Sequence, residues 1–186
     1  MLEPIDRRRL IGAARESVAR GFGHSRPAPL PAEHWSTALC MPGATFTTLT
    51  LGGELRGCRG TIEPRRTLIE DVWDNAWASA YDDPRFPPVA VDEVARLGIS
   101  ISVLSPLEPI PAPSEAALVA ALEPGVDGLV LSLGAARATF LPSVWRQLPE
   151  PREFVAQLKH KAGWPAAFWS PDLKAYRYRT ESFAEH

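Results

Sequence analysis

The sequence contains few cysteines and no excess of positive charge, and both absences narrow the classes of protein it can belong to. Only Cys40 and Cys58 occur among its 186 residues, without a Cys-x-x-Cys pair, so at most one disulfide could form. The formal net charge is -2, whereas nonspecific nucleic-acid binding usually comes with a strongly basic domain. We therefore do not expect nucleic acid as a partner.

Long apolar runs are also missing. No stretch approaches the roughly 20 apolar residues of a membrane-spanning helix, and the first residues, "MLEPIDRRRLIG", are too charged for a signal peptide. We therefore expect two reduced thiols in a cytoplasmic protein. No cofactor or metal is indicated, because no grouping of His, Cys and Asp has metal-site spacing; His34 and Cys40, in a proline-rich loop, are a weak signal.

Apolar residues make up 45% of the chain, which predicts a globular protein. Apolar spacing, capping residues and glycines predict helices over about 5–20, 68–80, 91–97, 115–122 and 150–162. Strands are predicted over 44–51, 54–62, 98–105, 129–133, 136–141 and 173–183, with hairpin turns at 52–53 and 134. The segment "PLEPIPAP", residues 106–113, is predicted to be a rigid linker.

The order of these elements favours an α+β fold with mainly antiparallel sheets flanked by helices. Strands and helices are mixed without strict βαβ alternation, and the hairpins are local. A parallel α/β fold is the alternative, but no glycine-rich phosphate loop opens a helix after the first strand.

The segment "GGELRGCRGTIEP", residues 52–64, places a cysteine between two arginines and two glycines in a predicted strand. Arg56 and Arg59 would favour the thiolate of Cys58, and N–H groups freed at Gly57 and Gly60 could help to hold a carboxylate or phosphate. Strand alternation puts Arg56 on the same face as Cys58, so Arg56 is the better candidate to contact the thiol. Alternatively, the cysteine is a small buried apolar residue, the glycines relieve strain, and the arginines form a solvated edge.

Two further segments carry candidate site residues. The loop "DDPRFPP", residues 82–88, presents Asp83 and Arg85 either as a pocket wall with Arg85 as an anion contact or, as the pattern favours, as a structural turn. His160 lies near a predicted helix C-terminus, where the helix dipole favours histidine, but it is one of few bases that could activate a thiol. The other histidines lie in predicted loops and a tail: His24, His34 and His186.

Five segments in order together resemble the AMME chromosomal-region protein family, also called AmmeMemoRadiSam system protein A. They are "ELRGCRGTIEPRR", "DPRFPP", "ISISVLSPLEPI", "GVDGLVLSLGAARATFLPSVW" and "FVAQLKHKAGW", and the resemblance spans about Leu10 to Phe183. The family's hallmark, Leu-Arg-Gly-Cys-Ile-Gly, falls on residues 55–60 with Arg59 in place of the apolar residue. The Arg59 side chain would point away from the thiol, so the departure would change the packing behind it.

The resemblance implies one domain over residues 1–186, with an α+β fold made of a larger and a smaller subdomain. The larger would be discontinuous if the first helix packs with the last strand. The hallmark segment, Leu55–Gly60, would line a cleft between them. The resemblance also implies a bacterial or archaeal setting, with a Memo-like protein and a radical S-adenosylmethionine enzyme as partners.

Two functions follow for the hallmark segment. We rank first a ligand- or partner-binding component, because the sequence shows no complete catalytic triad or metal site. The alternative is an enzyme in which Cys58 is a nucleophile or ligand-contacting thiol for a small anionic substrate. Arg56 and Arg85 would then hold the anion, and His160 would serve as the base.

Overall fold

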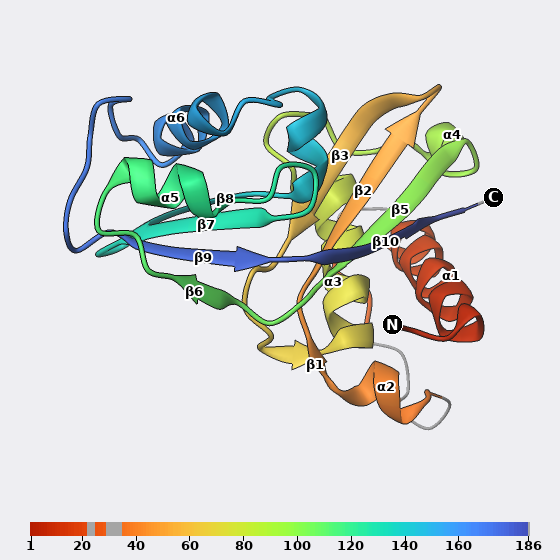
Figure 1. Ribbon diagram of the computed structural model, residues 1–186. Helices are drawn as coiled ribbons and strands as arrows, with labels where there is room; N and C mark the ends of the chain where they lie inside the picture. The colour runs from red at the N-terminus through yellow and green to blue at the C-terminus, as the bar shows by residue number, and fades with distance from the viewer. Residues whose placement is uncertain (22–24, 29–34, 186) are drawn as a thin grey trace. The chain divides into compact units, whose positions relative to one another are not determined.

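The computed structural model describes residues 1–21, 25–28 and 35–185, and the chain divides into two compact units (Figure 1). The first comprises Met1–Leu104 and Glu181–His186, and the second comprises Ser105–Thr180. Both contain helices and antiparallel strand pairs, which confirms the predicted α+β class. Within the described ranges, no helix is long and apolar enough to cross a membrane.

The first unit is built on a four-stranded sheet in the order β10-β5-β2-β3. Its strands are β2 (Thr45–Leu51), β3 (Glu54–Gly60), β5 (Leu97–Leu104) and β10 (Thr180–Ala184). The central strand β2 pairs antiparallel with both β3 and β5, and a two-stranded sheet joins β1 (Pro42–Gly43) to β4 (Arg66–Thr67). The edge strands of the main sheet are therefore β3 and β10.

Two long helices, α1 (Pro4–Arg20) and α3 (Leu68–Tyr81), cover one face of this sheet (Figure 1). The predicted capping box opens α3, because Thr67 Oγ1 accepts from the N–H of Glu70 and the Glu70 carboxylate accepts from the N–H of Thr67. The core between helices and sheet is apolar and includes Leu10, Val72, Trp73, Leu49, Ile99 and Ile101.

Two short helices, α2 (Thr37–Cys40) and α4 (Val91–Val94), complete the first unit. The helix predicted over 91–97 is wrong in its C-terminal half, because the chain turns after α4 and Leu97 is already the first residue of β5. Leu97 is 3% exposed, so burial in the sheet outweighs the local helical pattern.

The second unit has a sheet in the order β6-β9-β7-β8. Its strands are β6 (Glu108–Ile110), β7 (Gly128–Leu133), β8 (Ala136–Phe140) and β9 (Lys174–Tyr178). Its helices are α5 (Glu115–Ala121), the 3-10 helix at Pro142–Arg146 and α6 (Pro151–Lys161). In its core, the ring of Trp145 stacks on that of Phe154 with centroids 3.7 Å apart.

The predictions for residues 106–113 and 173–183 are corrected. The predicted linker 106–113 contains β6, whose proline is tolerated because β6 is an edge strand of its sheet. The predicted final strand 173–183 is two strands, β9 and β10, which belong to different sheets. The break falls at Arg179, whose N–H donates to Ser105 Oγ and whose carbonyl accepts from the N–H of Ser105.

Candidate functional site

The hallmark segment occupies the edge strand β3, which follows the predicted turn at Gly52 and Gly53 (φ 61° and 90°). The pairing with β2 is irregular: Leu49 lies opposite Gly57, whereas Thr50 lies opposite Leu55. One residue of β3, Arg56, is therefore an extra residue with no partner, as in a β-bulge. Strand alternation is interrupted at this residue.

At the bulge, the Arg56 guanidinium has partners other than the Cys58 thiol. Its guanidinium binds the Glu93 carboxylate in a bidentate pair, with N···O distances of 3.0 and 2.8 Å. It also donates to the carbonyls of Pro87 (2.9 Å) and Pro88 (3.2 Å). The Arg56 bonds, followed by the N–H of Ala90, lower the pKa of Glu93 to about 2. Arg56 thus anchors the 87–93 segment to the bulge, and its hydrogen bonds to described residues go to this segment.

The two glycines of the hallmark segment allow close packing of backbone and ring. A Cβ on Gly57 would collide with the carbonyl oxygen of Ser79 in α3, and a Cβ on Gly60 would collide with the ring of Phe46. Because α3 and β3 meet at Gly57, no other residue type fits there without displacing the helix. Close packing therefore explains the glycines at positions 57 and 60 without a bound ligand.

The backbone of Cys58 is bound by the loop predicted as a turn. Its N–H donates to Asp83 Oδ2 (2.9 Å), and its carbonyl accepts from Arg85 Nη2 (3.2 Å). Since both groups bind the loop instead of β2, they lie on the outer side of the edge strand. Asp83 and Arg85 therefore occupy the place of a neighbouring strand at this position.

The same two residues form an ion pair with each other. Arg85 Nε lies 2.9 Å from Asp83 Oδ1, and Arg85 Nη2 lies 2.6 Å from Oδ2. The pair lowers the pKa of Asp83 to about 2, chiefly through the Arg85 bonds, with smaller contributions from the N–H groups of Cys58 and Arg85. The Asp83 side chain is 2% exposed and that of Arg85 is 54% exposed, so the carboxylate is buried while the guanidinium faces solvent.

The Cys58 thiol itself is half-buried and receives a hydrogen bond from Thr48 Oγ1 at 3.3 Å. The pKa of Arg85 is raised, mainly by its side-chain bonds to Asp83. Sequence reasoning missed Thr48, because a regular two-residue hairpin would have set Thr48 opposite Gly57. The bulge shifts the register and brings Thr48 opposite Cys58.

The remaining candidates lie elsewhere. The Arg59 side chain is 44% exposed and lies 3.7 Å from Asp82, while its N–H donates to Ser79 Oγ. His160 is exposed in the last turn of α6, in the second unit, so it is not brought together with Cys58 within one unit. The other three histidines (His24, His34 and His186) lie outside the described residues.

Neither a metal centre nor a disulfide is found in the part of the chain that the structure describes. No group of three or more His, Cys, Asp or Glu residues could hold a metal ion there. Cys40, exposed at the end of α2, and Cys58 are both free thiols. The chemistry available at β3 is therefore that of one half-buried thiol beside a hydroxyl and a paired guanidinium.

The fold and this strand define an α+β protein of two units whose hallmark cysteine lies on an edge strand covered by an Asp–Arg loop. The AMMECR1 family model matches residues 11–183, so the chain belongs to the AMMECR1 family, which confirms the resemblance of its motifs. A protein of Methanothermobacter thermautotrophicus is 34% identical over 180 residues, covering 96% of this chain and 93% of the relative.

One further relative and one solved structure are also similar to this chain over nearly its whole length. Protein TK0174 of Thermococcus kodakarensis is 36% identical over 185 residues, which cover 95% of this chain and 88% of the relative. The crystal structure of protein PH0010 from Pyrococcus horikoshii superposes with a TM-score of 0.90 at 31% identity, covering 99% of this chain and 93% of that one. The similarity thus extends over both units of the fold.

Proposed function

We propose that this chain is a binding component, which presents the surface around the hallmark segment to a protein partner. The observation that supports this proposal is that the arginines of the region are bound internally by carboxylates. The pairs are Arg56–Glu93, Arg59–Asp82, Arg65–Glu63, Arg66 with Asp71 and Asp74, and Arg85–Asp83. At the Arg56–Glu93 pair, whose side chains are 12% and 17% exposed, a small anion would have to displace the carboxylate, whereas a protein can use the surface as it stands.

Exposed apolar side chains border this network. Leu55 is 44% exposed and Val91 is 59% exposed; Leu55 directly precedes Arg56, and Val91 lies two residues before Glu93. The Arg56 bonds to the Pro87 carbonyl and to the Glu93 carboxylate hold β3 and the 87–93 segment together. An ordered apolar surface loses little conformational entropy on association, which favours a docking surface over a catalytic pocket.

The partners that the family resemblance suggests are the Memo-like protein and the radical S-adenosylmethionine enzyme of the same genome. The test is sedimentation velocity and calorimetric titration of the full chain with each purified partner. We expect association with one of them, weakened about tenfold or more by Leu55→Asp, as for a buried interface residue. Met41→Asp is the matched control, because Met41 is also an exposed apolar side chain, 58% exposed.

The proposal fails if neither partner associates with the wild-type chain. It also fails if Leu55→Asp and Met41→Asp have the same effect, because the hallmark surface would then contribute nothing specific. Circular dichroism of both variants shows whether each remains folded.

A second candidate function, thiol chemistry at Cys58, is favoured by the Thr48 hydroxyl on the sulfur and by the Arg85 guanidinium, which donates to the backbone carbonyl of the same cysteine. Both would stabilise a thiolate. The test is the rate of Cys58 alkylation against pH in a Cys40→Ser background. An apparent pKa well below about 8.5 supports reactivity, whereas reaction only on unfolding assigns Cys58 to packing.

A further inference from the structure

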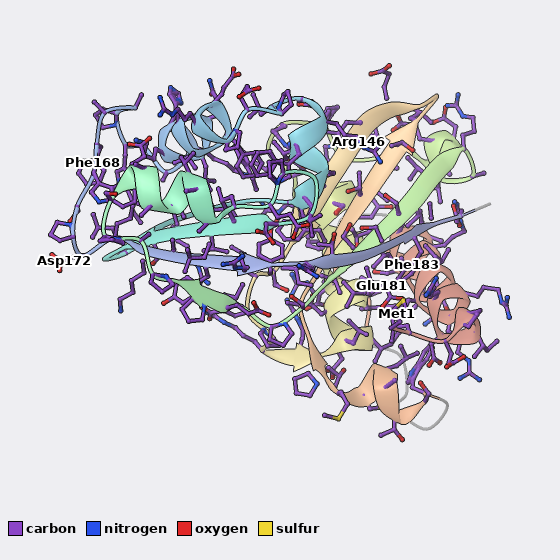
Figure 2. All side chains as sticks on the ribbon, in the orientation of Figure 1. Met1, Arg146, Phe168, Asp172, Glu181 and Phe183 are labelled. Carbon is purple, nitrogen blue, oxygen red and sulfur yellow. The ribbon has the colours of Figure 1, made fainter. Side chains whose placement is uncertain are left out.

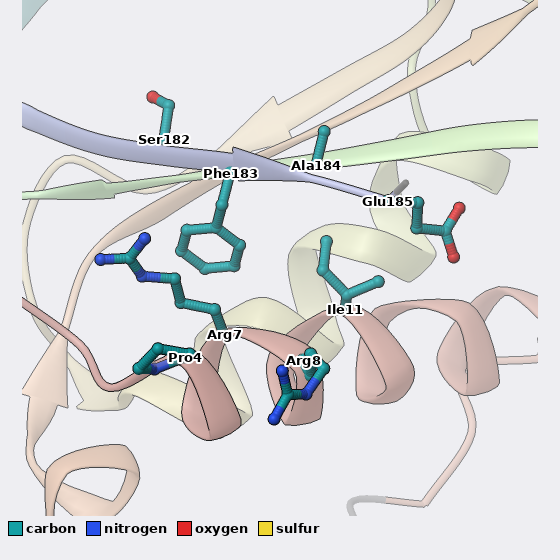
Figure 3. Close-up of a pocket in the computed structure, with 8 residues that line it drawn as sticks. All are labelled: Pro4, Arg7, Arg8, Ile11, Ser182, Phe183, Ala184 and Glu185. Carbon is teal, nitrogen blue, oxygen red and sulfur yellow. The ribbon is translucent and has the colours of Figure 1, made fainter.

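A groove lies beside β10, which is the edge strand opposite β3 in the sheet of the first unit. It is formed by four residues of the first turns of α1, by Ser182, Phe183 and Ala184 of β10 and by Glu185, which follows β10, and its volume is about 720 Å³. Figure 3 shows Phe183 extending from β10 toward α1 and Ile11 extending from α1 toward β10. The volume falls within the roughly 300–1,000 Å³ typical of ligand sites. None of the hallmark residues contributes to it.

The strand on one side of the groove has an open edge. The N–H of Glu185 donates to the carbonyl of Ile99 in β5, and Ser182 Oγ lies 2.8 Å from Ser102 Oγ. These contacts place Ser182 and Ala184 at positions whose N–H and C=O groups point away from β5. No described strand pairs with β10 on that side. Ser182 and Ala184 therefore offer backbone donors and acceptors to an additional strand.

Of the charged side chains that line the groove, Arg8 has no partner among the described residues. Arg7 lies 2.9 Å from Glu181 and donates to the carbonyl of Leu2, so it is neutralised. Glu185 is held by Arg15. Arg8 is exposed and has no hydrogen bond or ion pair to any described residue. Figure 2 shows Glu181 and Phe183 along β10, beside the start of the chain at Met1, whose neighbour Leu2 donates to Glu181.

We propose that this groove binds an extended acidic segment of a partner polypeptide, which pairs with β10 as an additional strand. The outward backbone groups of Ser182 and Ala184 would bind the main chain of the segment. Its alternate apolar side chains would lie on Phe183 and Ile11, and an acidic side chain would pair with Arg8. A free small anion would not use the strand edge, and an amphipathic helix would not satisfy it. The proposal concerns a different edge from the hallmark surface and does not depend on it.

The test uses the ¹⁵N-labelled full chain and the hexapeptide acetyl-Val-Glu-Val-Glu-Val-Glu-amide. We expect amide shifts confined to β10 and the first turns of α1, including Ser182 and Ala184. A matched peptide with lysine in place of glutamate should bind at least about tenfold more weakly, as expected when one ion pair becomes a repulsion. A peptide N-methylated at alternate residues should not bind, because it lacks the donors that pair with β10.

The matched protein variants are Arg8→Glu and Arg9→Glu. Arg9 is a neighbouring exposed arginine that does not line the groove and lies 3.5 Å from Asp6. We expect Arg8→Glu to weaken the acidic peptide about tenfold and Arg9→Glu to change binding less than about twofold. Ser182→Pro, which removes an outward N–H at a position where edge strands tolerate proline, should abolish binding, whereas Ser182→Ala should retain it.

Four results would each overturn the proposal. They are no shifts with millimolar acidic peptide, equal binding of the lysine peptide, equal binding of the N-methylated peptide, and equal effects of the two arginine variants. Equal binding of the N-methylated peptide would identify a side-chain pocket in place of strand addition. If Ser182→Pro does not fold, the N-methylated peptide still tests the same hydrogen bonds from the ligand's side.

Discussion

The two edge strands of the first unit's sheet, β3 and β10, differ in what lies against their outward backbone groups. At β3, the outward N–H and C=O of Cys58 are bound by Asp83 and Arg85, so another strand cannot pair there without displacing the loop. At β10, the outward groups of Ser182 and Ala184 face a groove of about 720 Å³. An unpaired edge is a site for strand addition unless something covers it. The Asp83–Arg85 loop thus covers β3 at Cys58, whereas no described strand covers the outer side of β10.

The largest expected effect is at Gly57, where the closed edge meets α3. Gly57→Ala places a methyl group on the Ser79 carbonyl, so we expect the free energy of unfolding to fall by about 3 kcal/mol. Urea denaturation measures it. The control is Gly12→Ala in the exposed part of α1, where a Cβ meets nothing within 4 Å, and which should stabilise by about 0.5–1 kcal/mol. Similar effects of both would show that Gly57 is not sterically constrained.

Removing the charge at Asp83 should have the next largest effect. Asp83→Asn weakens the bonds to Cys58 and Arg85 while the side chain stays buried, so we expect a loss of about 2 kcal/mol at pH 7. Asp82→Asn is the control, because Asp82 is 62% exposed and its nearest cation is 3.7 Å away; it should cost less than about 0.5 kcal/mol. Sedimentation velocity should also show more self-association of the Asp83 variant, because its β3 edge is uncovered.

The stability from Asp83 and Glu93 should depend on pH in a defined direction. Their folded pKa values are lowered to about 2 from 3.8 and 4.5, so folding favours the ionised forms. Their contribution is therefore complete above the unfolded pKa values and is lost as the pH falls from about 5 to 2. The deficit of Asp83→Asn relative to wild type should shrink over this window. A deficit that stays constant from pH 7 to pH 2 would contradict the assignment.

The smallest effect is expected at Thr48. Thr48→Val removes the hydroxyl that donates to Cys58 and keeps the shape of the side chain, so stability should change by less than about 0.5 kcal/mol. In a Cys40→Ser background, the alkylation rate of Cys58 at pH 7 should fall by about threefold, since the thiolate loses a donor. An unchanged rate would show that the hydroxyl does not act on the thiolate and would weaken the enzymatic alternative.

Much of the fold was predictable from local pattern. The capping box at Thr67, the glycine turn before β3 and the hairpin through Gly134 are confirmed, because each depends on residues close in the chain. The predictions for β6 and for the last strand were wrong because pairing between segments far apart in the chain decides both. β6 forms only because β9 pairs with it, and β10 separates from β9 because it joins the other sheet.

For the candidate site, the residue types were visible in the sequence but their partners were not. The crowding of arginines around Cys58 suggested free cations, whereas the structure pairs Arg56 with Glu93 and Arg85 with Asp83. The partner of Arg56 lies 37 residues along the chain. Nothing in the local pattern reports a contact at that distance.

The sequence by itself determined the α+β class, the family and the position of the hallmark segment on a strand, because hydrophobic period, capping and turn residues act over a few neighbours. The tertiary structure alone decided which edge of the sheet is closed. It set the register that brings Thr48 to the thiol, and it placed the loop that binds the backbone of Cys58. Both the register and the loop position depend on a bulge and on contacts between segments far apart in the chain. These contacts stabilise the protein only once α3, β2 and β3 have packed together.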